Sequence, residues 1–107
     1  MATKINIVID QGSTFNTEIT VLDENDTLID FSAYTANSQI RKSYSSSTYY
    51  NFDVSGSNSG VLTLSMNAAT TNTIPAGRYV YDVEVETSGI RSRIVEGIVV
   101  VTPQVTR

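Results

Sequence analysis

The fold is decided by one stretch, Arg78 to Glu86, which reads Arg-Tyr-Val-Tyr-Asp-Val-Glu-Val-Glu. Four apolar side chains fall on one face of it: Tyr79, Tyr81, Val83 and Val85. The residues between them are mostly acidic, and such a period of two is typical of a half-buried antiparallel strand. Ser88-Gly89 supplies a turn and Ile90 to Thr102 a second arm, so the sequence predicts a long β-hairpin.

The second arm of this hairpin begins with a basic outer face. Arg91 and Arg93 lie opposite the acidic outer face of the first arm. We therefore expect cross-strand ion pairs with Glu84 or Glu86, which help to set the register. Each such pair contributes a few tenths of a kcal/mol to about 1 kcal/mol.

The same arm loses its alternation toward its end. Glu96-Gly97 interrupts the pattern, which a β-bulge at Gly97 would explain. The run Ile98 to Val101 that follows is apolar on both faces. Either both faces of the strand are covered here, or one of them meets another subunit.

Further strands with the same period precede the hairpin. The pattern predicts them at Lys4 to Asp10, Phe15 to Val21, Tyr34 to Lys42, Tyr50 to Val54 and Val61 to Met66. Asn67 can cap one helical turn, and Ala69 and Ile74 are expected to close one end of the core. About seven or eight short strands predict an all-β domain spanning residues 1–107. We expect a single antiparallel β-sandwich, immunoglobulin-like or jelly-roll-like, with a small closed barrel as the alternative.

Composition excludes several functions. The 107 residues are 40% hydrophobic and 17% charged, as in a globular protein, and their net charge of -4 argues against nucleic-acid binding. The absence of cysteine and histidine excludes disulfides, thiolate nucleophiles, Ser-His-Asp triads and His or Cys metal sites. The N-terminus has no apolar run long enough for a signal peptide or membrane span, so we expect synthesis in the cytoplasm and no membrane contact.

Two acidic clusters are candidate sites. Asp23-Glu24-Asn25-Asp26 has the oxygen spacing of a calcium loop, but Leu28 and Tyr34 stand where its glycine and bidentate acid belong, which favours a solvated turn. Asp82 and Glu84 line up on one strand face, and a solvated outer face explains them more simply than hydrolysis. We expect no catalytic residue, no cofactor and no metal ion.

The segment Ser43 to Phe52 is serine-rich and aromatic. One interpretation is a hairpin tip, from which Tyr50 returns to the core. The other is a contact surface, because tyrosine offers rigid amphipathic area and serine offers adaptable hydrogen bonds. Under this second interpretation Tyr44, Tyr49 and Tyr50 form a stacking platform.

Several motifs occur in an order that resembles a known family. They are Gln11-Gly12-Ser13-Thr14-Phe15, Asp30 to Ala36, Gln39-Ile40-Arg41, Leu62-Thr63-Leu64, Ala68-Ala69-Thr70, Ile74 to Gly77, Tyr79 to Val83, Arg93 to Gly97, and Val101 to Arg107. Together they resemble the small β-domain of tailed-phage virion proteins, found at the N-terminus of upper-baseplate proteins of the BppU type. Such a domain commonly begins a longer chain and usually has Leu-Thr-Gly where Phe31-Ser32-Ala33 stands here.

The resemblance implies a non-enzymatic structural component of a tailed-phage virion, assembled in multiple copies. It would belong to the tail, baseplate or neck, or decorate the capsid, and its partners would be other virion proteins and copies of itself. Candidate contact surfaces are the tip from Ser43 to Tyr50, the strand Lys4 to Asp10, and the apolar end with its tail. The candidate interface residues are Tyr44, Tyr49, Tyr50, Ile98, Val99, Val101, Val105 and Arg107. The alternatives are a carbohydrate- or receptor-binding module and a small hydrolase.

Overall fold

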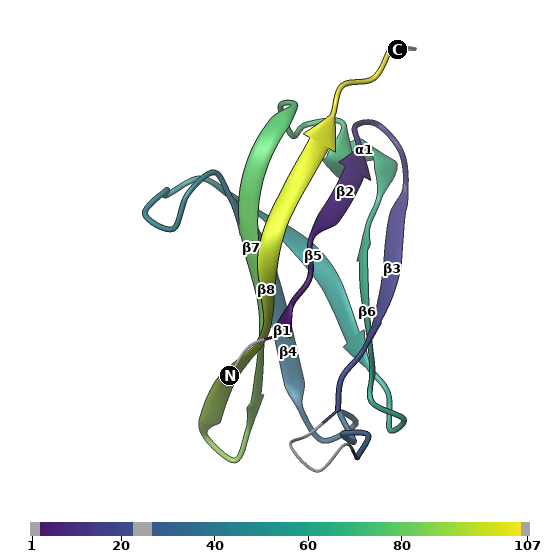
Figure 1. The fold of residues 1–107 in the computed structure, drawn as a ribbon, viewed down its shortest axis with the longest axis vertical. Helices are drawn as coiled ribbons and strands as arrows, with labels where there is room; N and C mark the ends of the chain where they lie inside the picture. The colour runs from purple at the N-terminus through teal and green to yellow at the C-terminus, as the bar shows by residue number, and fades with distance from the viewer. Residues whose placement is uncertain (1–2, 23–26, 106–107) are drawn as a thin grey trace.

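A computed structural model describes residues 3–22 and 27–105 of the chain (Figure 1). Within these residues the chain forms eight strands and one short helix, α1 (Ala68–Thr71). The strands are β1 (Thr3–Lys4), β2 (Ile7–Asp10), β3 (Phe15–Thr20), β4 (Thr35–Arg41), β5 (Tyr49–Gly56), β6 (Val61–Met66), β7 (Gly77–Thr87) and β8 (Ile90–Thr102). The prediction of an all-β chain with one helical turn is confirmed.

The described strands form one curled, mixed sheet in the order β1-β8-β7-β4-β5-β6-β3, with β2 also beside β8. β5 joins the two halves of the sheet, because Tyr49 to Phe52 pair with β4 whereas Asp53 to Gly56 pair with β6. Figure 1 shows β5 crossing obliquely from β4 toward β6. The sheet therefore curls into a half-barrel around its apolar face.

The prediction of a purely antiparallel arrangement is wrong for the N-terminal strands. β1 and β2 both run parallel to β8, with Thr3 opposite Val95 and Ile7 opposite Val99. The cause lies in the pattern itself, because side chains alternate with a period of two in parallel and antiparallel strands alike. Alternation therefore located these strands correctly but carried no information about their direction.

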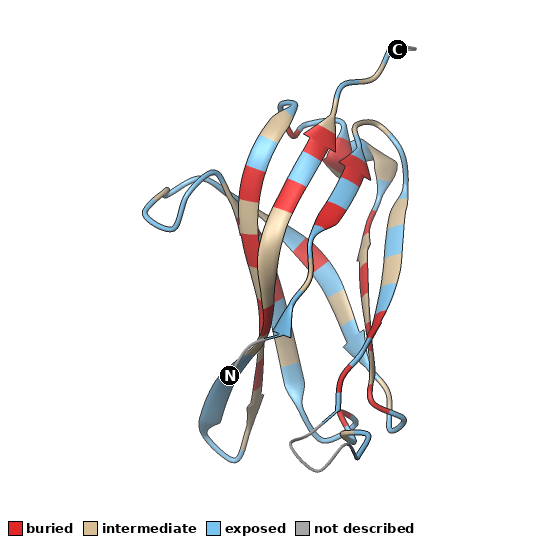
Figure 2. Ribbon diagram, in the orientation of Figure 1, coloured by how far each residue is buried: buried red, intermediate tan, exposed pale blue. Residues whose placement is uncertain are grey.

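The core lies on the concave side of the sheet, and the predicted faces point into it. Tyr79, Tyr81, Val83 and Val85 of β7 are all buried, and so are Leu62, Leu64 and Met66 of β6. Figure 2 shows buried and more accessible residues alternating along β7. Burial of these side chains supplies the main stabilisation of the domain, at roughly 25 cal/mol per Å² of apolar surface.

The hairpin of β7 and β8 has the predicted turn but a different bulge. Ser88 and Gly89 both have positive φ, 51° and 79°, as a tight two-residue β-turn requires. The register shifts between Val83 and Glu84, which makes Ile94 the extra residue of β8. The bulge predicted at Gly97 is therefore wrong.

Gly97 has another structural role. It pairs in register with Tyr81, and a Cβ added to it would collide with the carbonyl oxygen of Ile5. The same carbonyl accepts a hydrogen bond from the Tyr81 hydroxyl at 2.7 Å. Gly97 thus permits the backbone between β1 and β2 to approach β8 closely.

One end of the half-barrel is closed around α1. The Asn67 side chain caps this helix by accepting a hydrogen bond from the Thr70 amide at 2.8 Å. Ile74 is fully buried, as predicted, but Ala69 is exposed and Thr71 takes the inner position. The Thr71 hydroxyl donates to the Ser13 carbonyl at 2.8 Å, which ties α1 to the turn after β2.

Candidate interaction surface

The outer face of β2, β8, β7, β4 and β5 carries side chains directed away from the core. The strand register places Ile98, Val80, Arg41 and Tyr49 in one row across β8, β7, β4 and β5. The next row holds Val8, Val100 and Arg78, on β2, β8 and β7. We call Val8, Val80, Ile98 and Val100 the apolar half of this face.

The apolar half is accessible. Val8 has 62% of its surface exposed and Val100 has 41%, while Ile98 and Val80 are half-buried. These side chains are neighbours across three adjacent strands, because strands in a sheet lie about 5 Å apart. Contiguous apolar surface of this kind marks contact sites more often than single exposed residues do.

An arm formed by residues 42–48 borders this face. It joins β4 to β5 and projects from the body of the domain, as Figure 1 shows. Arg41 holds it in place by donating one hydrogen bond to the Ser46 carbonyl at 2.5 Å and another to the Gln39 side chain at 2.9 Å. The Arg41 guanidinium also lies 4.9 Å from the ring centre of Tyr49, and Tyr44 on the arm is 74% exposed.

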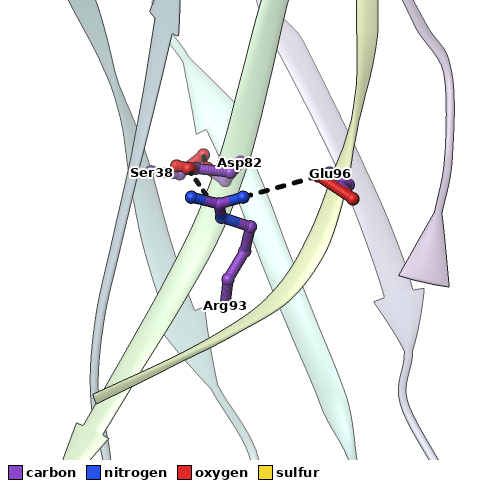
Figure 3. Close-up of polar contacts among 4 residues, drawn as sticks. All are labelled: Ser38, Asp82, Arg93 and Glu96. Carbon is purple, nitrogen blue, oxygen red and sulfur yellow. Dashed lines mark hydrogen bonds and ion pairs between the residues drawn. The ribbon is translucent and has the colours of Figure 1, made fainter. Parts of the chain in front are cut away.

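The other half of the face is charged. We define this charged half by Asp82, Glu84, Glu86, Arg91, Arg93 and Glu96. Arg93 lies between two carboxylates, 3.2 Å from Asp82 and 3.6 Å from Glu96 (Figure 3). Arg91 lies 3.6 Å from Glu86, as the predicted cross-strand pairing requires. Arg93 lies opposite the predicted Glu84 in the register, but its guanidinium forms its ion pairs with Asp82 and Glu96 one row away.

Asp82 is the electrostatic centre of the charged half. Partial burial raises the pKa of its carboxyl group, and repulsion from Glu84 and Glu96 raises it further. Attraction to Arg93 and Arg41 lowers the same pKa but does not cancel these effects. On the inner side of the sheet, the buried Ser38 hydroxyl donates to the backbone carbonyl of Asp82 at 2.6 Å, which fixes β4 against β7.

Two shallow hollows lie along β4 and β7 on this face. Their volumes are about 230 Å³ and about 250 Å³, and both are lined by Gln39, Asp82 and Glu84. The second hollow extends to Val80 and Tyr44, so it adjoins the apolar half. The arrangement offers polar and charged groups beside an aromatic ring.

The three tyrosines predicted to form one platform lie on two different sides of the sheet. Tyr44 and Tyr49 border the outer face, but Tyr50 pairs with Ile40 and is half-buried against the core. Tyr50 instead lines a separate hollow with Pro75 and Tyr79. The prediction that the three tyrosines form one stacking platform is therefore wrong, because successive residues of a strand point to opposite faces.

The predicted interface at the end of β8 also needs correction. Val99 and Val101 have 0% and 2% of their surface exposed and belong to the core, so they offer no contact surface. Ile98 does lie on the outer face, with Val100 beside it. Val105 is 96% exposed beyond β8, and Arg107 lies outside the described residues.

Val8, Val80 and Val100 are not among the candidate interface residues, although two of them lie in the predicted contact surfaces Lys4 to Asp10 and Ile98 to Val101. Val8 and Val80 alternate with inward-pointing neighbours, so the pattern placed them on the outer face, whereas Val100 stands in an apolar run without alternation. What the pattern lacked was the register, which alone brings Val8 beside Val100 and Val80 beside Ile98.

No group of three or more metal-ligating side chains occurs in the described part of the chain. The acidic turn Asp23 to Asp26, which has the oxygen spacing of a calcium loop, lies outside the described residues. Asp82 and Glu84 lie side by side on β7 and do not face each other across a cleft. None of the helices that the structure describes is long and apolar enough to cross a membrane.

Comparison with known proteins shows the fold alone. No protein-family model matches the sequence, and no curated protein sequence matches it significantly. Among solved structures, the chain resembles an endo-β-1,4-mannanase from Thermotoga petrophila with 12% identity and a TM-score of 0.53, over 92% of this chain and 18% of that one. It also resembles Listeria monocytogenes InlP with 13% identity and a TM-score of 0.52, over 94% of this chain and 28% of that one. The chain thus spans less than a third of either protein.

Proposed function

We propose that this chain is a non-enzymatic structural component of a tailed-phage virion, assembled in several copies at the tail, baseplate, neck or capsid surface. The observation that carries the proposal is the contiguous apolar half, exposed on the outer face beside Tyr44 and Tyr49. Such a surface is suited to contact with protein. The assignment to a virion rests on the resemblance to the β-domain of phage baseplate proteins. The expected partners are other virion proteins and further copies of the chain.

The acidic residues support a structural role over a catalytic one. Asp82 and Glu96 are bound to Arg93, and Glu86 is bound to Arg91. A glycosidase holds two carboxylates on opposite sides of a bound sugar, whereas these carboxylates share one strand face. The likeness to a mannanase, at 12% identity, is a likeness of fold and adds no support for hydrolysis.

In finer terms, we propose that the curled sheet is an immunoglobulin-like sandwich. The Tyr79 hydroxyl donates to the Pro75 carbonyl at 2.5 Å, and Tyr79 lies near the start of the penultimate strand, as the tyrosine corner of that architecture does. The division of β5 between two sets of partners supplies the transition from one layer to the other. A crystal structure in which β5 paired with β4 along its whole length would contradict this assignment.

The virion proposal is tested by the composition of particles. Particles released by the organism that encodes this chain should contain it in many copies, as measured by quantitative mass spectrometry and by its position in a cryo-electron microscopy map. Val100→Lys should prevent its incorporation, because a charge is placed in the apolar half. Ile90→Lys is the matched control, since Ile90 is 68% exposed at the end of the hairpin, outside that half, and it should be incorporated normally. Absence of the chain from particles would overturn the proposal.

A second candidate function is a carbohydrate- or receptor-binding module. The hollow that joins Tyr44 to Gln39, Asp82 and Arg93 favours it, because it offers hydrogen-bonding groups beside an aromatic ring. A glycan array should then give a signal that Tyr44→Ala abolishes. Tyr50→Ala is the control, because Tyr50 lies on the other side of the sheet. An empty array would exclude glycans as the ligand.

A further inference from the structure

We infer that the apolar half binds a second copy of this chain, face to face, about a two-fold axis that runs across the strands between the rows of Val100 and Ile98. The inference rests on the proposed function, since it names the partner of the same surface. It goes beyond the proposed function because self-association can be measured on the purified chain, without particles. Two observations carry it: the distribution of apolar residues and the distribution of charges about this line.

Ile98 and Val100 are self-complementary about the axis. Rotation places β8 over the partner's β8 in the opposite direction, so that Val100 lies over the partner's Ile98 and Ile98 over the partner's Val100. Val8, which is 62% exposed beside Val100, is covered in the same step. The rotation thus removes from water the contiguous apolar surface of both copies, which is the dominant favourable contribution to association.

The charges near the axis are self-complementary as well. Lys4 and Asp10 occupy outward positions on the N-terminal strands, at equal distances on opposite sides of the axis, level with Glu96 and Thr102. The rotation therefore places each Lys4 over the partner's Asp10. Arg78, in the row of Val100, comes within one row of the partner's Asp82, or about 7 Å, which an arginine side chain can span. Arg78 has no ion-pair partner among the described residues of its own chain.

The apolar residues also select the direction of the axis. An axis parallel to the strands, between β7 and β8, would place Val100, which is 41% exposed, over the partner's Arg78. The axis across the strands places Val100 over the partner's Ile98, and the rows of Glu84 and Glu86 then lie beyond the overlap.

The first test is the mass of the purified chain by sedimentation equilibrium. The apolar half is small, so a weak dimer is expected, and the measurement should cover about 10 to 500 μM chain. We expect the mass to rise from 11.7 kDa toward twice that value. Val100→Lys should raise the dissociation constant about thirtyfold or more, while Ile90→Lys, at an exposed position far from the overlap, leaves it unchanged. A chain that stays monomeric, or a dimer insensitive to Val100→Lys, would overturn the inference.

The second test fixes the orientation without disturbing the apolar residues. Lys4→Asp and Asp10→Lys should each weaken self-association about tenfold, because each creates two like-charge contacts per dimer. An equimolar mixture of the two variants forms a heterodimer in which both contacts are attractive again. Its affinity should return to within about threefold of the original. A mixture no tighter than either variant alone would exclude this axis.

The outcomes separate this inference from the proposed function. A monomeric chain whose Val100→Lys variant fails to enter particles would leave the virion role standing, with a different virion protein on this face. A dimer with the predicted charge pairing, from a chain absent from particles, would leave the inference standing and remove the virion role.

Discussion

The outer face of β7 and β8 changes character at Gly97, with the charged half on one side of it and the apolar half on the other. In the charged half Arg91 and Arg93 each lie within 3.6 Å of a carboxylate of the same chain. In the apolar half Val8 and Val100 have 62% and 41% of their surfaces in water. Five of the six residues of the charged half therefore form ion pairs within one molecule, whereas the apolar half gains stability only when another surface covers it.

The largest expected effect tests whether the end of β8 really has two different faces. Val99→Lys should lower the free energy of unfolding by more than about 4 kcal/mol, because it buries a charge where the side chain is 0% exposed. Val100→Lys should change it by about 0.5 kcal/mol or less, because its side chain points to water. Urea unfolding of both variants at low protein concentration, where the chain is monomeric, measures the difference. Equal destabilisation would mean that both faces are covered within one chain.

This end of β8 also shows how far the sequence determines the structure. The run Ile98 to Val101 was ambiguous, since four apolar residues in succession have no alternation from which to read a face. The ambiguity is resolved by pairing, because β2 lies beside β8 and β7 on its other side. Register and strand direction depend on contacts between residues more than 90 positions apart, which a local pattern does not encode.

The hairpin of β7 and β8 marks the opposite case. Its strands, its turn and its buried face were all predictable, because Tyr79 to Val85 alternate apart from the apolar Val80, and Ser88-Gly89 suits a tight turn. The bulge was placed wrongly at Gly97, since a glycine in a strand indicates either a bulge or a close backbone approach. Only the position of Ile5, at the far end of the chain, distinguishes the two.

A substitution at Gly97 should destabilise the border between the charged half and the apolar half. Gly97→Ala should lower the free energy of unfolding by about 1 to 3 kcal/mol, because the new methyl group displaces the Ile5 carbonyl. It should also accelerate hydrogen exchange of the Ile5 amide, which donates to the Glu96 carbonyl at 2.9 Å. Gly89→Ala is the contrasting control: its methyl group meets open space, so only the positive φ opposes it and exchange at Ile5 stays unchanged. Identical exchange in both variants would contradict the close approach.

Tyr81 lies beside Gly97 and contacts the same Ile5 carbonyl from the core side of the sheet. Tyr81→Phe should cost about 1 kcal/mol of stability, because the Ile5 carbonyl loses its donor. Burial raises the pKa of Tyr81 to about 12, above the ordinary value of 10. Because the pKa of Tyr81 is higher in the folded chain than in the unfolded one, its contribution to stability is fully present below pH 10. This contribution is lost as the pH rises through about 12.

The measurement is unfolding at fixed urea concentration as the pH rises from neutral to alkaline. Tyr81→Phe should flatten the loss of stability above pH 10, whereas Tyr44→Phe should leave it as it is, because Tyr44 is 74% exposed. A Tyr44 variant that flattened the curve equally would mean that general alkaline repulsion, and not Tyr81, governs the transition.

The smallest effect concerns the charged half, where the balance around Asp82 can be shifted without unfolding the chain. Because the folded pKa of Asp82 is raised, its contribution to stability is present below the unfolded pKa and is lost as the pH rises through the folded one. Glu84→Gln should lower the pKa of Asp82 by removing a repulsion, and Arg93→Gln should raise it by removing an attraction. Carboxyl carbon NMR titration resolves both directions. If neither variant moved this pKa, desolvation alone would control Asp82, and the charged half would then not be balanced by its own arginines.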